Sequence, residues 1–160
     1  GVCVEIEGET TRGVVPLIVH RDNLPLLERI ADGEIRAMRT TFLSPFDNLF
    51  WARDRAELLW GFTQRLEAYT PAPKRKYGYF SLPIVHHDRL VGRFDPKLDR
   101  KTGILTLRTL HLEPDITLEE ELGTGIAAAL RDFLTFHKAS KLAIEFSNPP
   151  KFGAALLRRF

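Results

Sequence analysis

The chain has 160 residues, of which 44% are hydrophobic and 28% charged, and its formal net charge is +2. This length suits one domain with its own core, or a domain together with part of a neighbour. No apolar run approaches the ~20 residues of a membrane-spanning helix, so the composition predicts a soluble globular protein and excludes a helical membrane protein.

The start of the chain predicts its cellular setting. Residues 2–6 are interrupted by Glu5 and follow no basic region, so they do not resemble a signal peptide. Cys3 is the only cysteine, which excludes an internal disulfide and a cysteine-based zinc site and predicts a reducing cytoplasm. Because the chain starts at Gly1 and its only methionine is Met38, we expect further chain upstream in the parent protein.

A hairpin and a short helix are expected in the first part of the chain. Residues 2–7 alternate apolar and polar side chains, and residues 14–20 return as a second extended run after a turn. Asp22 or Asn23 is placed to cap a helix that Gly33 would end. The apolar face of this helix is expected to consist of Leu24, Leu27 and Ile30, with Pro25 in the first turn.

The stretch FLSPFDNLFWARDR, residues 42–55, predicts a packed connector between two units. Pro45 holds Ser44 extended, and Asp47 is placed to cap the turn that follows. An apolar plug is expected from Phe46, Leu49, Phe50 and Trp51. The helix predicted over residues 53–62 would then turn Leu58, Leu59 and Phe62 inward.

An antiparallel meander is predicted after this helix. Residues 77–85 are rich in aromatic and branched side chains, residues 90–94 return after a polar turn, and residues 104–112 form a third long strand. Residues 96–103 between the last two strands are predicted to be a polar and basic loop.

A long amphipathic helix is predicted from Thr117, whose hydroxyl would form a capping box with Glu120. Its buried face is expected to contain Leu118, Leu122, Ile126, Leu130 and Phe133. A strand over residues 141–146 and a short C-terminal helix follow. The predicted fold class is α+β, with an antiparallel meander or small barrel, flanking helices and a hairpin before them.

Positive charge is concentrated between Pro71 and His111, where nine basic and three acidic residues give a segment charge of +6 and leave −4 for the rest. Aromatic side chains lie beside these cations, a mixture typical of nucleic-acid contact. The alternative is that the cations are solvated residues that protect a sheet edge from aggregation. The nine candidate nucleic-acid-binding residues are Lys74, Arg75, Lys76, Arg89, Arg93, Lys97, Arg100, Lys101 and Arg108.

Other candidate motifs favour structural roles. The segment Gly123–Ala128 is similar to a dinucleotide fingerprint but lies inside the predicted helix, so its glycines are expected to permit close packing. His86 and His87, adjacent in a strand, are expected to face opposite sides and lack metal-ligand spacing, so we predict no metal site. Asp95 and Asp99 are expected to pair with nearby cations or cap turns rather than serve in acid–base catalysis.

Three segments resemble one known family. LSPFDNLFW (43–51), LLWGFTQRLEAYTPAPKRKYGYFSLPIVHHDRLVGRFDPKLDRK (58–101) and LRTLHLEP (107–114) are similar to the C-terminal part of the winged-helix DNA glycosylases that unhook interstrand crosslinks, the YcaQ/AlkZ-like family. The resemblance implies a bacterial cytoplasmic protein of tandem winged helices and a β-barrel, which hydrolyses the N-glycosidic bond of alkylated purines without metal or organic cofactor. It implies double-stranded DNA as the partner, no membrane association and a monomer.

On this resemblance, residues 1–41 would be the end of a winged-helix unit, with the hairpin as its wing. Residues 42–160 would form a β-barrel-like C-terminal domain with flanking helices.

The catalytic element of the family is a Gln, a hydrophobic residue, then Gln or Asp. The single glutamine here, Gln64, precedes Arg65, Leu66 and Glu67, so this element is missing and we predict no catalytic residue. The chain is therefore expected to be the DNA-binding region of a parent glycosylase, inactive alone. The alternative is a structural or protein-interaction β-domain, and the acid-rich helix over residues 117–138 is a further candidate for docking on another protein.

Overall fold

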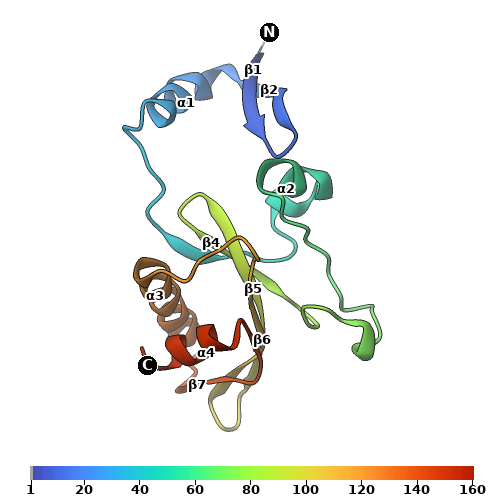
Figure 1. The fold of residues 1–160 in the computed structure, drawn as a ribbon, viewed down its shortest axis with the longest axis vertical. Helices are drawn as coiled ribbons and strands as arrows, with labels where there is room; N and C mark the ends of the chain where they lie inside the picture. The colour runs from blue at the N-terminus through green and yellow to red at the C-terminus, as the bar shows by residue number, and fades with distance from the viewer. Residues whose placement is uncertain (1) are drawn as a thin grey trace.

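The computed structural model describes residues 2–160, with Arg53 described by its backbone alone, and has a mixed α+β fold. One sheet is a hairpin near the N-terminus, and the other is larger and curls into a half-barrel (Figure 1). Four α-helices accompany the two sheets in this part of the chain. The hairpin and first helix lie at one end of the molecule, and the half-barrel with the last two helices lies at the other. The predicted α+β class is confirmed.

The hairpin consists of β1 (Cys3–Thr10) and β2 (Gly13–His20), which pair antiparallel as predicted. Half-buried and exposed side chains alternate along most of both strands, as expected when one face of a sheet is partly covered. In the turn, Thr11 donates its hydroxyl to the carbonyl of Leu58 at 2.8 Å, and its backbone N–H donates to the same oxygen at 2.9 Å. The hairpin turn therefore holds the end of helix α2 (Arg53–Trp60).

Helix α1 (Leu24–Ala31) follows the hairpin through a short 3-10 turn, Arg21–Asn23. Gly33 has a φ of 74° and lies just beyond the helix end, as predicted. The predicted side-chain cap is wrong, because the 3-10 turn leads directly into the helix. His20 Nδ1 accepts from the N–H of Asp22 at 3.3 Å instead.

The connector after α1 is only partly packed. Asp47 caps the 3-10 turn Asn48–Phe50 as predicted, since its Oδ1 accepts from the N–H of Leu49 at 2.9 Å. Phe50 is buried in a small apolar cluster with Phe62. The side chains of Phe46 and Trp51 are 67% and 85% exposed, so the predicted four-residue plug is wrong for these two.

The predicted antiparallel meander is present in the half-barrel as β4 (Leu82–His86), β5 (Arg89–Asp99) and β6 (Ile104–Leu112). A further strand that was not predicted, β3 (Thr40–Phe42), pairs antiparallel with β4. The predicted last strand, β7 (Lys141–Ile144), pairs with β6 in parallel, and β8 (Ser147–Asn148) pairs with β6 further along. Parallel pairing requires a long crossover connection, which helix α3 (Glu120–Phe136) supplies.

Two predicted strand boundaries are wrong. Residues 77–81 are irregular, because several of their N–H groups donate to carboxylates rather than to a neighbouring strand. Strand β5 instead continues to Asp99 through the predicted loop, and the chain turns only over residues 100–103. A register shift between Asp95 and Pro96 accommodates a proline that has no N–H to donate.

Helix α3 packs its apolar face on the half-barrel as predicted, burying Leu122, Ile126 and Leu130. The predicted capping box at Thr117 is wrong, because the helix begins at Glu120 and Thr117 lies too far before it. A Cβ added to Gly125 would lie 2.3 Å from Thr40 Oγ1, which confirms that this glycine permits close packing. Helix α4 (Pro150–Leu157) completes the same core with two buried side chains, Phe152 and Leu156.

Candidate nucleic-acid interface

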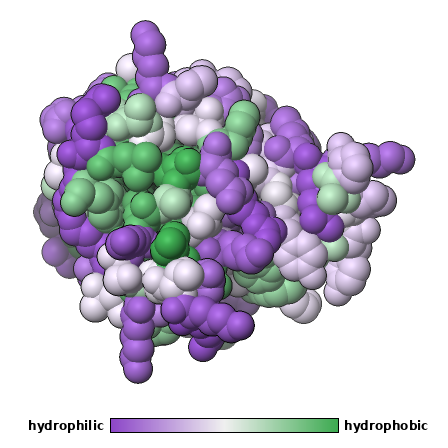
Figure 2. All heavy atoms as spheres, turned by 90° about the horizontal axis from the view of Figure 1, so that it is seen from below, coloured by the Kyte–Doolittle hydropathy of each residue, from purple (hydrophilic) through white to green (hydrophobic). Residues whose placement is uncertain are grey.

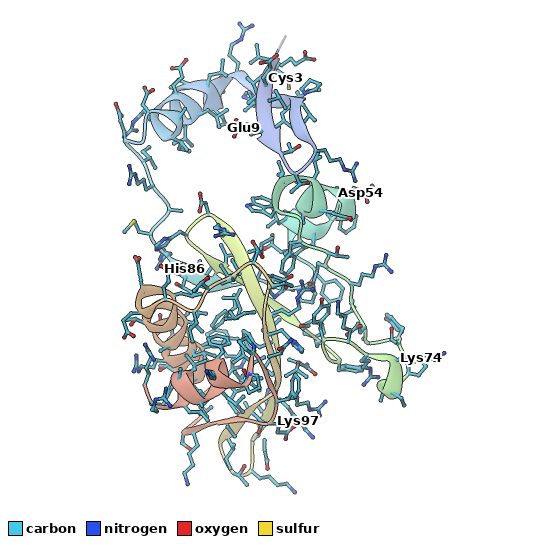
Figure 3. The ribbon with its side chains drawn as sticks, viewed as in Figure 1. Cys3, Glu9, Asp54, Lys74, His86 and Lys97 are labelled. Atoms are coloured by element: carbon cyan, nitrogen blue, oxygen red, sulfur yellow. The ribbon has the colours of Figure 1, made fainter. Side chains whose placement is uncertain are left out.

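Three of the nine basic side chains predicted to bind DNA lie on one projection from the half-barrel. Residues 65–80, here called the basic arm, leave the end of α2, extend sideways and return at β4, with Lys74 at the outer end (Figure 3). Gln64 Nε2 donates to the carbonyl of Ser81 at 3.2 Å and so joins the two ends of the arm. Four cationic side chains and one acidic side chain belong to the arm: Arg65, Lys74, Arg75, Lys76 and Glu67.

The acidic residue of the arm shapes its backbone. Glu67 accepts three backbone hydrogen bonds, from Lys76 at 2.9 Å, Tyr77 at 2.7 Å and Gly78 at 3.1 Å. Gly78 has a φ of 126°, and a Cβ there would lie 2.5 Å from Asp95, so this position requires glycine. The two sides of the arm are therefore tied together by one carboxylate.

A second carboxylate ties the arm to the sheet. Asp95 in β5 is buried, and its two oxygens accept from the N–H groups of Tyr79 at 2.8 Å and Phe80 at 3.0 Å. Asp99 likewise accepts from the N–H of Lys101 at 2.9 Å, and this bond lowers the pKa of Asp99. Asp99 therefore caps the turn after β5, as predicted, whereas Asp95 lies within β5 and binds backbone groups of the arm instead of capping a local turn.

Arg93 anchors the base of the arm. Its side chain is only 2% exposed, and its guanidinium donates to Glu113 Oε1 at 2.7 and 3.1 Å and to the carbonyl of Thr63 at 2.8 Å. The guanidinium lies between two aromatic rings, 3.9 Å from the centroid of Phe62 and 4.0 Å from that of Tyr77. Its donors therefore face inward, and Arg93 presents no charge at the surface.

The other predicted cations divide into groups. Lys97 in β5 and Arg108 in β6 lie on the sheet face opposite the apolar core, and Arg108 has no register partner because it falls at the bulge. Arg100 and Lys101 lie in the turn between β5 and β6, at the end of the sheet. Arg89 lies at the other end of β5, where its guanidinium donates to Asp115 at 2.9 Å. The structure thus places three of the nine on the arm and two on the outer sheet face, and it pairs Arg89 and Arg93 with carboxylates.

Aromatic side chains accompany the cations on the arm. The guanidinium of Arg75 lies 5.0 Å from the ring centroid of Tyr79, and Lys76 Nζ lies 4.8 Å from that of Tyr77. Tyr69 was not among the predicted site residues, yet it lies in the turn of the arm and is highly exposed. Two prolines that follow it closely, Pro71 and Pro73, are the sequence feature that could have indicated a projecting turn.

A large apolar cavity of about 1060 Å³ lies between α3 and strands β3 to β6, and Phe80 at the end of the arm is among its lining residues. His86 and His87 lie at this cavity and stack with ring centroids 4.0 Å apart. The prediction that they face opposite sides is wrong, because His87 has a φ of 56° and so leaves the strand conformation. His86 Nδ1 lies 2.8 Å from Thr40 Oγ1, and burial lowers the pKa of His86, as does the adjacent His87.

The arm and the body of the molecule differ in surface character. Seen from below, apolar side chains gather on the body of the molecule, while the arm at its side is largely hydrophilic (Figure 2). Within residues 2–160, no three His, Cys, Asp or Glu side chains are placed to hold a metal ion. None of the helices described in that range has the length and apolar character required to span a bilayer.

The structure is thus an α+β half-barrel with a projection that carries basic and aromatic side chains. The chain belongs to the AlkZ-like DNA glycosylase family, whose sequence profile, described as DNA glycosylase AlkZ-like, matches residues 2–136. The match includes the hairpin, the arm and all of α3, and the predicted family resemblance is confirmed. No solved structure matches the chain. The chain is therefore assigned to a family of DNA repair glycosylases.

Proposed function

We propose that this chain is the DNA-binding C-terminal region of a bacterial glycosylase that removes alkylated purines and unhooks interstrand crosslinks. The observation that supports DNA binding is the basic arm, on which Arg75 and the exposed Lys76 lie beside aromatic rings and Lys74 is exposed at the outer end. Each phosphate that a lysine neutralises releases counterions, so binding of this kind weakens steeply as salt rises. Lys97 and Arg108 on the adjoining sheet face would extend the same positive surface.

The division of the chain is part of this proposal. We propose that residues 1–41 are the end of a winged-helix unit, with β1 and β2 as its wing, and that residues 42–160 form the barrel-like domain. The separation of the hairpin from the half-barrel in Figure 1 supports this division. Strand β3 starts at Thr40 and pairs with β4, so the first strand of the larger sheet lies at the boundary.

Bond cleavage is proposed to belong to chain outside these residues. The only glutamine, Gln64, is buried, and its amide is engaged with the carbonyl of Ser81 and with Arg93 at 3.4 Å. A side chain held in this way is not available to position a water molecule against a glycosidic bond. Incubation of the chain with DNA containing a methylated purine is expected to release no free base, whereas measurable release would contradict this part of the proposal.

DNA binding is tested by titrating fluorescent duplex DNA at two salt concentrations. The double variant Lys74→Ala and Lys76→Ala is expected to lower the affinity several-fold and to reduce the slope of log affinity against log salt by up to about 2. The matched control is Lys141→Ala with Lys151→Ala, which removes the same charge from exposed sites away from the arm. Absence of duplex binding at low salt, or equal losses in both double variants, would contradict the proposed interface and favour a protein-interaction domain.

A further inference from the structure

We propose that the basic arm recognises a nucleobase that is not stacked in a duplex, and that the ring of Tyr69 at its turn stacks on that base. This inference rests on the proposed DNA binding and specifies the feature of DNA that the arm would recognise. The phosphates on either side of the base would be neutralised by Lys74 and Lys76.

The exposure of Tyr69 is the first observation. Its side chain is 93% exposed, more than any other large apolar or aromatic side chain in the described part of the chain. It lies in the turn between Glu67 and Thr70, which the N–H of Thr70 closes by donating to the carbonyl of Glu67 at 2.9 Å. In residues 2–160 its ring makes no aromatic or cation–π contact. One whole ring is therefore presented to solvent at a turn.

The order of the arm is the second observation. Arg75 Nε donates to the carbonyl of Thr70 at 2.8 Å, and Glu67 ties the other side of the arm by its three backbone bonds. Pro71 and Pro73 restrict the backbone between them. An exposed element that is already ordered loses little conformational entropy when it binds a partner, so the turn is preorganised to present its ring.

Charge identifies the class of partner. The only acidic side chain of the arm, Glu67, accepts backbone hydrogen bonds, whereas Lys74 and Lys76 are exposed. An anionic partner is therefore favoured over an apolar protein surface. Among anionic partners, a nucleic acid is the one that also offers flat rings on which tyrosine stacks favourably.

The same geometry favours an unpaired base over an intact duplex. Inside a duplex both faces of each base are covered by neighbouring bases, so a protein ring can stack only at a bulge, a flipped nucleotide or a strand end. A rigid turn cannot itself follow the grooves as a long helix does. Tyr69 is thus expected to contribute to binding only where a base has left the stack.

The test compares two fluorescent duplexes that are identical except for one unpaired adenine in the second, by anisotropy at one salt concentration. The wild-type chain is expected to bind the bulged duplex about tenfold more tightly than the intact one. Tyr69→Ala is expected to abolish this preference and to leave affinity for the intact duplex unchanged. Tyr69→Phe is expected to retain it, because stacking requires the ring and not the hydroxyl. The matched control is Phe136→Ala, which removes another highly exposed ring from α3.

The outcomes separate this inference from the proposed function. Equal binding of both duplexes by the wild-type chain, or equal losses on both in Tyr69→Ala, would overturn the role of Tyr69 while leaving DNA binding intact. Loss of the preference in Tyr69→Phe or Phe136→Ala would also overturn it. Absence of binding to either duplex would overturn both proposals.

Discussion

The half-barrel core and the basic arm both contact strand β5, but they are stabilised by different interactions. Phe94 and Leu98 of this strand face the core, which α3 and α4 cover with apolar side chains. Arg93 and Asp95 face the other way and hold the arm through hydrogen bonds and ring contacts. One face of this strand thus packs in the apolar core, and the other face binds the arm. Substitutions on its two faces are expected to have different consequences.

The largest expected effect is on the core face. Phe94→Ala is expected to lower the free energy of unfolding by about 4 kcal/mol, because it leaves a cavity at a position with no exposure. Urea denaturation followed by circular dichroism measures this change. Phe136→Ala, which removes an exposed ring, is expected to change it by less than about 0.5 kcal/mol. Similar values for the two variants would contradict the assignment of the core.

Arg93→Met is expected to be the next most destabilising, by about 3 kcal/mol, because it leaves the partly buried carboxylate of Glu113 without its cation. The methionine retains part of the packing between Phe62 and Tyr77, so the loss reports mainly on the ion pair and hydrogen bonds. Limited proteolysis is expected to cut the arm faster in this variant. A loss below about 1 kcal/mol would show that the ion pair of Arg93 with Glu113 contributes little to folding stability.

Glu67→Gln is expected to act on the arm alone, with a loss of about 1–2 kcal/mol in local stability. An amide has one acceptor oxygen where the carboxylate offers two, so the three N–H bonds cannot all be retained. Hydrogen exchange is expected to speed up at Lys76, Tyr77 and Gly78. DNA affinity is expected to fall although a negative charge is removed.

The control for this variant is Glu57→Gln on α2, where the carboxylate is exposed and makes no hydrogen bond in the described structure. It removes the same charge without touching the arm. If both variants raise DNA affinity equally, charge and not backbone positioning governs binding.

The smallest expected effect is a pH dependence. Burial lowers the pKa of His111, as does the nearby Arg93, and the ring lies against Tyr77 at the base of the arm. The unfolded chain therefore binds a proton more readily than the folded one. Stability is expected to be full above the ordinary histidine value near 6.5 and to fall as the pH drops below it, by at most about 1.4 kcal/mol per pH unit for each such group.

Replacing each histidine in turn measures separately the contributions of the arm base and of the core cavity to this pH dependence. His111→Asn is expected to reduce the dependence of the free energy of unfolding on pH, because it removes the titrating group beside Tyr77 at the base of the arm. His86→Asn is expected to reduce the same pH dependence, because burial also lowers the pKa of His86, which lies at the cavity beside α3. An unchanged slope in both variants would contradict a folding linkage through these histidines.

Local sequence patterns predicted the elements that depend on short-range interactions. The hairpin, helix α1 with its terminal Gly33, strand β6 and the buried face of α3 all follow from alternation, helical spacing and turn residues close in the chain. The wrong predictions concern positions where a distant partner competes with local preference. Residues 77–81 have strand-like composition but donate to Glu67 and Asp95, and His87 leaves the strand conformation to stack on His86.

For the candidate site, the sequence identified the basic segment but could not sort its members. Arg93 and Lys97 are four residues apart in one strand, yet the first is enclosed by Phe62, Tyr77 and Glu113 while the second is exposed. The sequence around Tyr69 did not lead us to predict that its ring is exposed. Whether a side chain is exposed depends on which segments pack over it, and those segments are distant in the sequence.

The sequence by itself determined the α+β class, the positive segment and the family to which the chain belongs, because composition, periodicity and ordered motifs are properties of the linear chain. Only the tertiary structure decided that residues 65–80 form an ordered projection and that α3 returns the chain to a parallel strand. The physical reason is that carboxylates such as Glu67 and Asp95 satisfy backbone groups 9 to 16 residues away, and such bonds form only when the fold brings them together.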